Sequence, residues 1–141
     1  MRVAYQAGTR RWLLLPAAIL VLSGLAAGCS SSKPAYCTDA ANLKTSVSNL
    51  GNVNVAANGL GSLQAALSSV QANASSFASD AKSAFPSQAT ALQNSVSSLG
   101  AAITSAKGQP PLTAATAVAS AVAQVKTSAS AVQSAVSGTC Q

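Results

Sequence analysis

The chain has 141 residues, which suits one small domain, and 49% of them are hydrophobic, 4% aromatic and 7% charged. Basic residues outnumber acidic ones by 8 to 2, but Arg2, Arg10 and Arg11 lie near the N-terminus and the lysines are scattered. Nucleic-acid binding needs a clustered basic patch and is therefore not expected. The absence of His excludes a Ser-His-Asp or Cys-His catalytic arrangement within the chain.

Residues 1–28 have the organisation of a secretion signal. Residues 1–12 are positively charged, residues 13–25 are apolar, and small residues ending at Gly28 precede Cys29. A signal peptide has this order, with an apolar core of about 7–15 residues, whereas a membrane span needs about 20. The sequence therefore predicts export and cleavage between Gly28 and Cys29. The alternatives are an uncleaved anchor, or plain secretion with an ordinary cysteine.

The stretch LAAGC resembles the lipobox of bacterial lipoproteins, although Leu25 stands four places before Cys29 and Ala26 takes the third place, where that family favours Leu. The resemblance implies that Cys29 carries diacylglyceryl and N-acyl groups, and that residues 29–36 form a lipidated tether. More than one acyl chain is needed for stable anchoring. We therefore expect a protein held at the outer face of the cytoplasmic membrane or in the cell envelope, with no cofactor besides this covalent lipid.

Cysteine parity predicts a disulfide bond. The chain has 3 cysteines, and lipidation of Cys29 leaves Cys37 and Cys140 as an even pair. Export to an oxidising compartment permits a bond between them. Two free thiols are the alternative.

From Cys37 onward, apolar residues recur at spacings of three and four, which is the period of an amphipathic helix. For the first helix we expect Thr38 or Asp39 as the N-cap, because a side-chain oxygen there accepts a free backbone N–H. Gly51 is suited to close it. Its apolar positions are Ala40, Leu43, Val47 and Leu50.

Residues 52–59 break this period and predict a loop whose valines, Val53 and Val55, turn inward. Phe85–Pro86 interrupts the second helix, because a residue before proline avoids the helical region. Pro86 suits the first position of a new helix, so we favour a turn there over a kink. The apolar positions of the second helix are Leu60, Leu63, Leu67, Val70, Ala74, Phe77, Ala81 and Ala84.

Two further helices complete the pattern. The third is expected to stop at Gly108, with Pro110 and Pro111 beyond it. Its apolar positions are Ala89, Leu92, Val96, Leu99, Ile103 and Ala106. Those of the fourth are Val118, Val122, Val125, Ala129, Val132 and Val136.

A bond between Cys37 and Cys140 selects the topology of the domain, residues 37–141. The two Cα atoms must lie within roughly 7 Å, so both ends of the domain must meet at one end of the bundle. Four antiparallel helices satisfy this and three do not. The sequence therefore predicts an all-α, up-down-up-down four-helix bundle with an Ala/Val-rich core.

A short internal repeat accompanies this pattern. Residues 43–51 (LKTSVSNLG) and 92–100 (LQNSVSSLG) agree at six of nine positions, at an offset of 49. A duplicated helical hairpin would explain the agreement, and so would chance similarity in a chain biased toward Ala and Ser.

Signals for catalysis are weak. Asp39 is interpreted as a helix cap and Asp80 as part of a solvated face, 41 residues away. Ser79 and Lys82 match the S-x-x-K pattern of a serine nucleophile, but the supporting motifs are missing. Zinc needs close groups of Cys, His or carboxylates. We therefore predict no catalytic residue and no metal site.

The leader, the Ala/Ser-rich mature chain and residues 43–71 together resemble small lipoproteins of actinobacteria, including mycobacterial ones. The resemblance implies localisation and fold but no activity. We predict a non-enzymatic structural or interaction module with the membrane and an unidentified envelope protein as partners. The alternative is a carrier of an apolar ligand, in a cavity of about 300 Å³ or more lined by Leu60, Phe77, Phe85 and Ile103. The matching residues are Leu43, Ser46, Val47, Leu50, Asn52, Val53, Val55, Gly59, Leu63 and Leu67.

Overall fold

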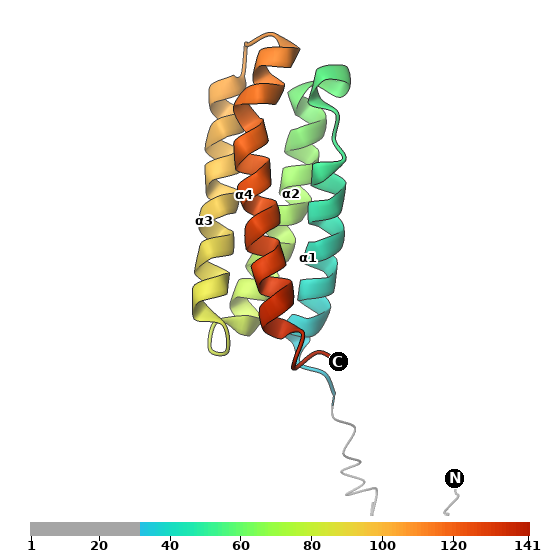
Figure 1. The fold of residues 1–141 in the computed structure, drawn as a ribbon, viewed down its shortest axis with the longest axis vertical. Coiled ribbons are helices and arrows are strands. Elements are labelled where there is room, and N and C mark those ends of the chain that lie inside the picture. The colour runs from blue at the N-terminus through green and yellow to red at the C-terminus, as the bar shows by residue number, and fades with distance from the viewer. Residues whose placement is uncertain (1–31) are drawn as a thin grey trace, which may run out of the picture. The chain divides into compact units, whose positions relative to one another are not determined.

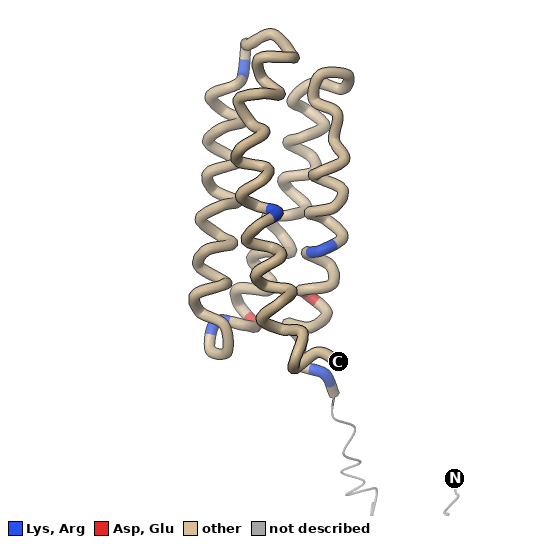
Figure 2. The backbone as a smooth tube through the Cα atoms, in the orientation of Figure 1, with Lys and Arg blue, Asp and Glu red and all other residues tan. Residues whose placement is uncertain are grey.

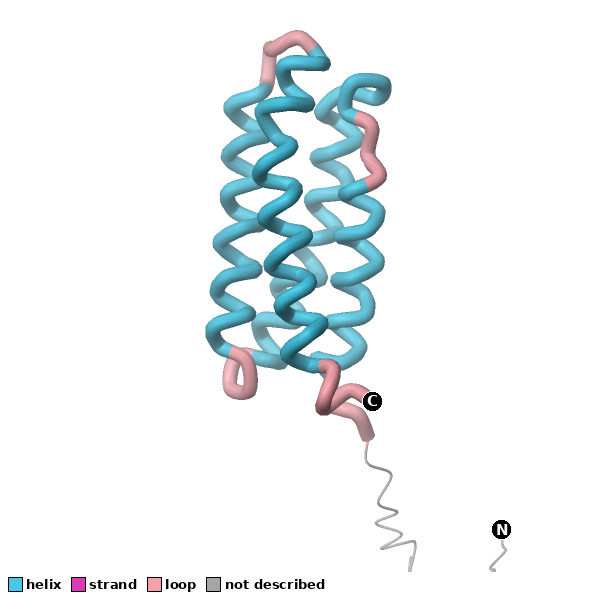
Figure 3. Tube along the Cα trace, in the orientation of Figure 1, coloured by secondary structure: helices cyan, strands magenta, loops and turns pink. Residues whose placement is uncertain are grey.

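The computed structural model describes residues 32–141, so the predicted leader, its cleavage point and Cys29 lie outside the described residues. Within that range the chain forms four helices and no strand (Figures 1 and 3). They are α1 (Ala35–Gly51), α2 (Val55–Ala81), α3 (Pro86–Ala106) and α4 (Pro111–Val136). Short connections at alternating ends make an up-down-up-down bundle (Figure 1). The predicted fold class is confirmed.

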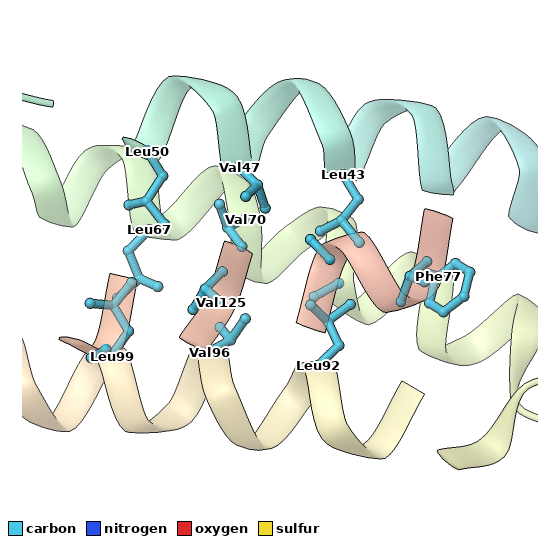
Figure 4. Packing of buried hydrophobic residues seen from close by; sticks show 14 of the residues in the cluster. Leu43, Val47, Leu50, Leu67, Val70, Phe77, Leu92, Val96, Leu99 and Val125 are labelled. Carbon is cyan, nitrogen blue, oxygen red and sulfur yellow. The ribbon is translucent and has the colours of Figure 1, made fainter. Parts of the chain in front are cut away.

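The four helices share one core of small and medium-sized apolar side chains. Figure 4 shows Leu50, Leu67 and Leu99 pointing into the same interior, with valines of all four helices at the next level. Each helix packs against its neighbours in the ring, and α2 also contacts α4 across the bundle, whereas α1 and α3 make no such contact. The bundle is therefore narrower along the diagonal that joins α2 and α4.

The start of α1 differs from the prediction. Helix α1 begins at Ala35 after the extended Pro34, whose carbonyl accepts the N–H of Cys37 at 2.9 Å, and no side chain caps it. Proline has a fixed φ and needs no N–H at a helix start, so the first turn forms ahead of Cys37. Thr38 and Asp39 consequently lie inside α1, and the prediction that one of them is the N-cap is wrong.

The connection between α1 and α2 is shorter than the predicted loop. Asn54 caps α2 by accepting the N–H of Ala57 at 3.0 Å, so helical structure resumes at Val55. The helical backbone of α2 is interrupted at Gly59, where φ is 72° and ψ is 177°. Only glycine adopts this backbone region readily. Val55 is buried and Val53 is partly buried against the core, so both valines turn inward as predicted.

The Phe85–Pro86 step is a turn, as predicted, because α2 ends at Ala81 and Pro86 is the first residue of α3. Of the expected core positions, Ala84 is wrong, and Leu60 and Val122 only pack against the edge of the core. Ala84 lies beyond the end of α2 and is exposed. Val122 is only partly buried, and Ala121 takes the inward position on α4.

The burial pattern shows that the hairpin α1–α2 and the hairpin α3–α4 are structurally equivalent. An offset of 49 residues pairs every buried apolar residue of α1 with a buried residue of α3. An offset of 51 pairs six of the eight buried residues of α2 with buried residues of α4, whereas the large Phe77 corresponds to the partly buried Ser128. Those pairs are Leu63/Ala114, Leu67/Val118, Val70/Ala121, Ala74/Val125, Ala78/Ala129 and Ala81/Val132.

Candidate functional site

The end of the bundle where the chain enters is closed by covalent and polar contacts. Cys37 and Cys140 form the predicted disulfide, with Cα atoms 5.5 Å apart. Lys33 donates to the carbonyl of Cys140 at 2.9 Å. Tyr36 and Phe85 pack edge to face beside it, with ring centroids 5.4 Å apart. The first helix, the last helix and the α2–α3 turn are therefore joined at this end, which we call the disulfide end.

The predicted lipidation site, Cys29, lies outside the described residues and precedes Lys33 by four residues in the sequence. Over residues 32–141, the helices are too short or too polar for any of them to cross a membrane.

The two acidic side chains, Asp39 and Asp80, interact, and this contact was not predicted from the sequence. Asp80 is exposed near the end of α2, as predicted, but Asp39 is partly buried on α1 within its reach. Burial, and then the hydrogen bond with Asp80 and the negative charge of Asp80, raise the pKa of Asp39. Oδ2 of Asp39 is buried without a hydrogen-bond partner in the described residues. The antiparallel packing of α1 against α2 brings Asp39 and Asp80 close together although they are far apart in the sequence.

Ser79 and Lys82, the S-x-x-K match, lie in a shallow groove between α2 and α3. The groove has a volume of about 320 Å³, and Thr90 and Gln93 form its other wall. Neither Asp39 nor Asp80 lines it. Among residues 32–141, no three His, Cys, Asp or Glu residues gather where they could hold a metal ion.

A larger groove of about 470 Å³ runs between α1 and α4. Lys44 and Lys126 line it, together with hydroxyl and amide side chains and an apolar floor of Val47 and Ala129. Gln133 crosses one end and donates to the carbonyl of Ala40 at 2.6 Å. Figure 2 shows how sparse charged residues are along the bundle, so two lysines in one groove are a local concentration of charge.

An apolar recess of about 400 Å³ lies at the opposite end of the bundle from the disulfide. Its walls come from the α1–α2 connection and the starts of α2 and α4. Leu112, three residues before the lining residue Ala115 on α4, is 74% exposed. Of the residues predicted to line a carrier's cavity, Phe77 and Ile103 are sealed in the core, and Leu60 and Phe85 pack against it. The recess has a different lining: Leu50, Val53, Val55, Leu63, Ala115, Val118 and Val122.

No protein-family model, curated protein or solved structure matches this chain. The fold and the grooves define its class as a disulfide-closed, all-α four-helix bundle. The sequence correctly predicted the pairing of Cys37 with Cys140, but the groove between α1 and α4 was missed. The signal that could have found it was present, since Lys44 and Lys126 both flank core positions of helices that the disulfide brings side by side.

Proposed function

We propose that this chain is a cell-envelope lipoprotein, anchored through acyl groups on Cys29, and that its bundle acts as a non-enzymatic interaction module. The observation that carries the proposal is the disulfide end. Cys37–Cys140 and the Lys33 contact with Cys140 fix the entry of the chain and its C-terminus at one place. A lipid only four residues ahead of Lys33 would hold that end near the membrane and leave the long faces of the bundle free for a partner.

The composition supports a role without catalysis. The chain has no His, and its 2 acidic residues are the Asp39–Asp80 pair. That pair does not line the groove that holds Ser79 and Lys82. A serine nucleophile needs a base within hydrogen-bond reach and a third group to orient that base, and no acidic side chain lines the groove beside Ser79 and Lys82.

The test of this proposal compares the wild type with Cys29→Ser in intact cells. Mass spectrometry of the wild type should find an N-terminus at Cys29 with added acyl mass, and the variant should leave the membrane fraction. Crosslinking before lysis should then capture an envelope protein on the wild type. A wild-type N-terminus that lacks acyl mass or retains the leader contradicts the anchor.

A second candidate, the carrier of an apolar ligand, is favoured by the recess at the far end of the bundle. Its volume of about 400 Å³ lies within the range of about 300–1,000 Å³ for small-molecule pockets. Ala119→Trp would fill it from α4. If the recess binds an acyl chain, a fluorescent fatty acid should bind the wild type and not Ala119→Trp, whereas equal signals from both contradict the carrier.

A further inference from the structure

The groove between α1 and α4 differs in charge from its structural counterpart. The offsets of 49 and 51 that relate the two hairpins map this groove onto the one between α2 and α3. Four lining positions appear in both grooves under this mapping: Ala129/Ala78, Ser130/Ser79, Gln133/Lys82 and Lys44/Gln93. The bundle therefore contains two related grooves, whose charged residues can be compared position by position.

The difference is the pair of lysines. Gln93 on α3 takes the place of Lys44, and Ser75 on α2 takes the place of Lys126, while the counterpart has its own Lys82. The α1–α4 groove thus has two ammonium groups where its counterpart has one. The only acidic residues of the described chain, Asp39 and Asp80, do not line it. Both charges are available to an anion.

The side chain of Lys126 lies over Gly51 at the edge of the groove. A Cβ atom built on Gly51 would lie 3.4 Å from Nζ of Lys126 and 3.6 Å from its Cδ and Cε atoms. The absence of a side chain at position 51 therefore leaves the surface of α1 open for the lysine to lie across. Lys44 precedes Gly51 by seven residues, or about 10 Å of helix. Lys44 therefore lies about two helical turns from the place where Lys126 crosses α1, and the flexible four-carbon stems allow both ammonium groups to turn toward the polar side chains between them.

We propose that this groove binds a phosphorylated polyol, such as a sugar phosphate or a glycerol phosphate unit. Lysine ammonium groups are compact point charges suited to phosphate. Hydroxyl and amide groups of the groove suit the hydroxyls of a polyol, and Val47 and Ala129 suit its carbon skeleton. The hydroxyl and amide side chains are those of Ser48, Asn52, Ser130, Gln133 and Ser134.

The position of the groove favours a soluble or polymer-borne phosphate over the headgroup of a membrane lipid. Lys44 and Gly51 follow Cys37 by 7 and 14 residues, which places the groove about 10–20 Å along the bundle from the disulfide end. A headgroup in a bilayer that meets the disulfide end would not reach it. This preference rests on the proposed anchoring at Cys29, but the phosphate site itself does not.

The test is a titration of the ¹⁵N-labelled full-length protein with glycerol phosphate, followed by amide chemical shifts. Shifts should concentrate at Lys44, Ser48, Lys126 and Ser130. Lys44→Gln and Lys126→Ser copy the counterpart groove, and each should weaken binding about fivefold, the scale of one exposed charge contact. Lys107→Gln removes an equal charge outside the groove and should leave the affinity unchanged.

Three results would overturn the proposal. An equal loss on Lys107→Gln would show general attraction by net charge. Inorganic phosphate that binds as tightly as glycerol phosphate would show that the polyol is not recognised. Sedimentation with phosphatidylglycerol vesicles that depends on Lys44 and Lys126, without shifts from glycerol phosphate, would assign the groove to a lipid headgroup. The Cys29→Ser comparison tests the anchor separately, since it does not alter the groove.

Discussion

Ser46 on α1 and Ser95 on α3 are equivalent residues on two helices that do not touch each other. They are 5% and 8% exposed, and each donates its hydroxyl to the carbonyl three residues earlier, at 3.0 Å to Leu43 and 2.9 Å to Leu92. Helical periodicity alone repeats the apolar positions, but it does not require a buried serine at the same place in both hairpins. This shared serine favours duplication over chance as the origin of the internal repeat.

Equivalence of the two serines predicts equal mutational effects. Ser46→Leu and Ser95→Leu should each destabilise the protein by roughly 1–3 kcal/mol, because each would overpack a filled core. Their effects should add, since the two sites share no contact. Denaturant unfolding measures this, with Ser98→Leu on the exposed face of α3 as the control. Unequal losses would show that the two halves have diverged in packing.

The disulfide should supply a large part of the stability. Cys37 and Cys140 are 103 residues apart, and losing a native disulfide from a small exported domain costs about 2–5 kcal/mol. The double variant Cys37→Ser with Cys140→Ser should unfold at a correspondingly lower denaturant concentration. Reductant should lower the midpoint of the wild type and leave that of the variant unchanged. Cys29→Ser, used as the control, should retain the full stability.

Stability should fall as the pH rises above about 4. The pKa of Asp39 is raised from its ordinary value of 3.8 by burial and by Asp80, so the folded protein binds this proton more tightly than the unfolded chain does. The free energy of unfolding therefore decreases as the pH passes from 3.8 to the folded pKa, and stays lower above it.

The variant Asp39→Asn should remove this pH dependence and stabilise the protein at pH 7, by up to about 1 kcal/mol on the scale of partly exposed charge pairs. Asp80→Asn should remove only part of it, since burial of Asp39 remains. Thermal unfolding across pH measures both variants. A wild type that becomes more stable between about pH 4 and 7 would contradict the carboxyl interaction.

Two neighbouring glycines should respond to alanine in opposite ways. Gly59 has a φ of 72° and Gly61 does not have a positive φ, while neither has an atom within 4 Å of an added Cβ. Gly59→Ala should destabilise by about 1–3 kcal/mol through backbone strain. Gly61→Ala should stabilise by about 0.5–1 kcal/mol, because alanine favours the helix. Calorimetry measures both midpoints. If Gly59→Ala and Gly61→Ala shifted the unfolding midpoint in the same direction, α2 would be continuous through Gly59.

The sequence predicted most of the helical fold because its two strongest signals agree. Apolar spacing located the helices, and the pair Cys37 and Cys140 required an even number of them. Pro86, at the start of α3, then distinguished a turn from a kink. These signals are local or covalent, so they can be interpreted without knowing how the helices pack.

The errors arose where neighbouring helices or backbone geometry decide the outcome. Asp39 was predicted as a cap because the sequence does not show that Pro34 already starts the helix. Its contact with Asp80 depends on the register of α1 against α2, which spacing along one helix does not contain. The early start of α2 at Val55 depends on the Asn54 cap and on a glycine-only conformation at Gly59.

The disulfide also determines how the bundle carries load. A pull on the N-terminal segment passes through Cys37 into Cys140 and so reaches the first and last helices together. Because both lie at the same end (Figure 1), α1 cannot be peeled away alone. A force applied at Cys37 must therefore displace α1 and α4 together, whereas without the bond it would act on α1 alone.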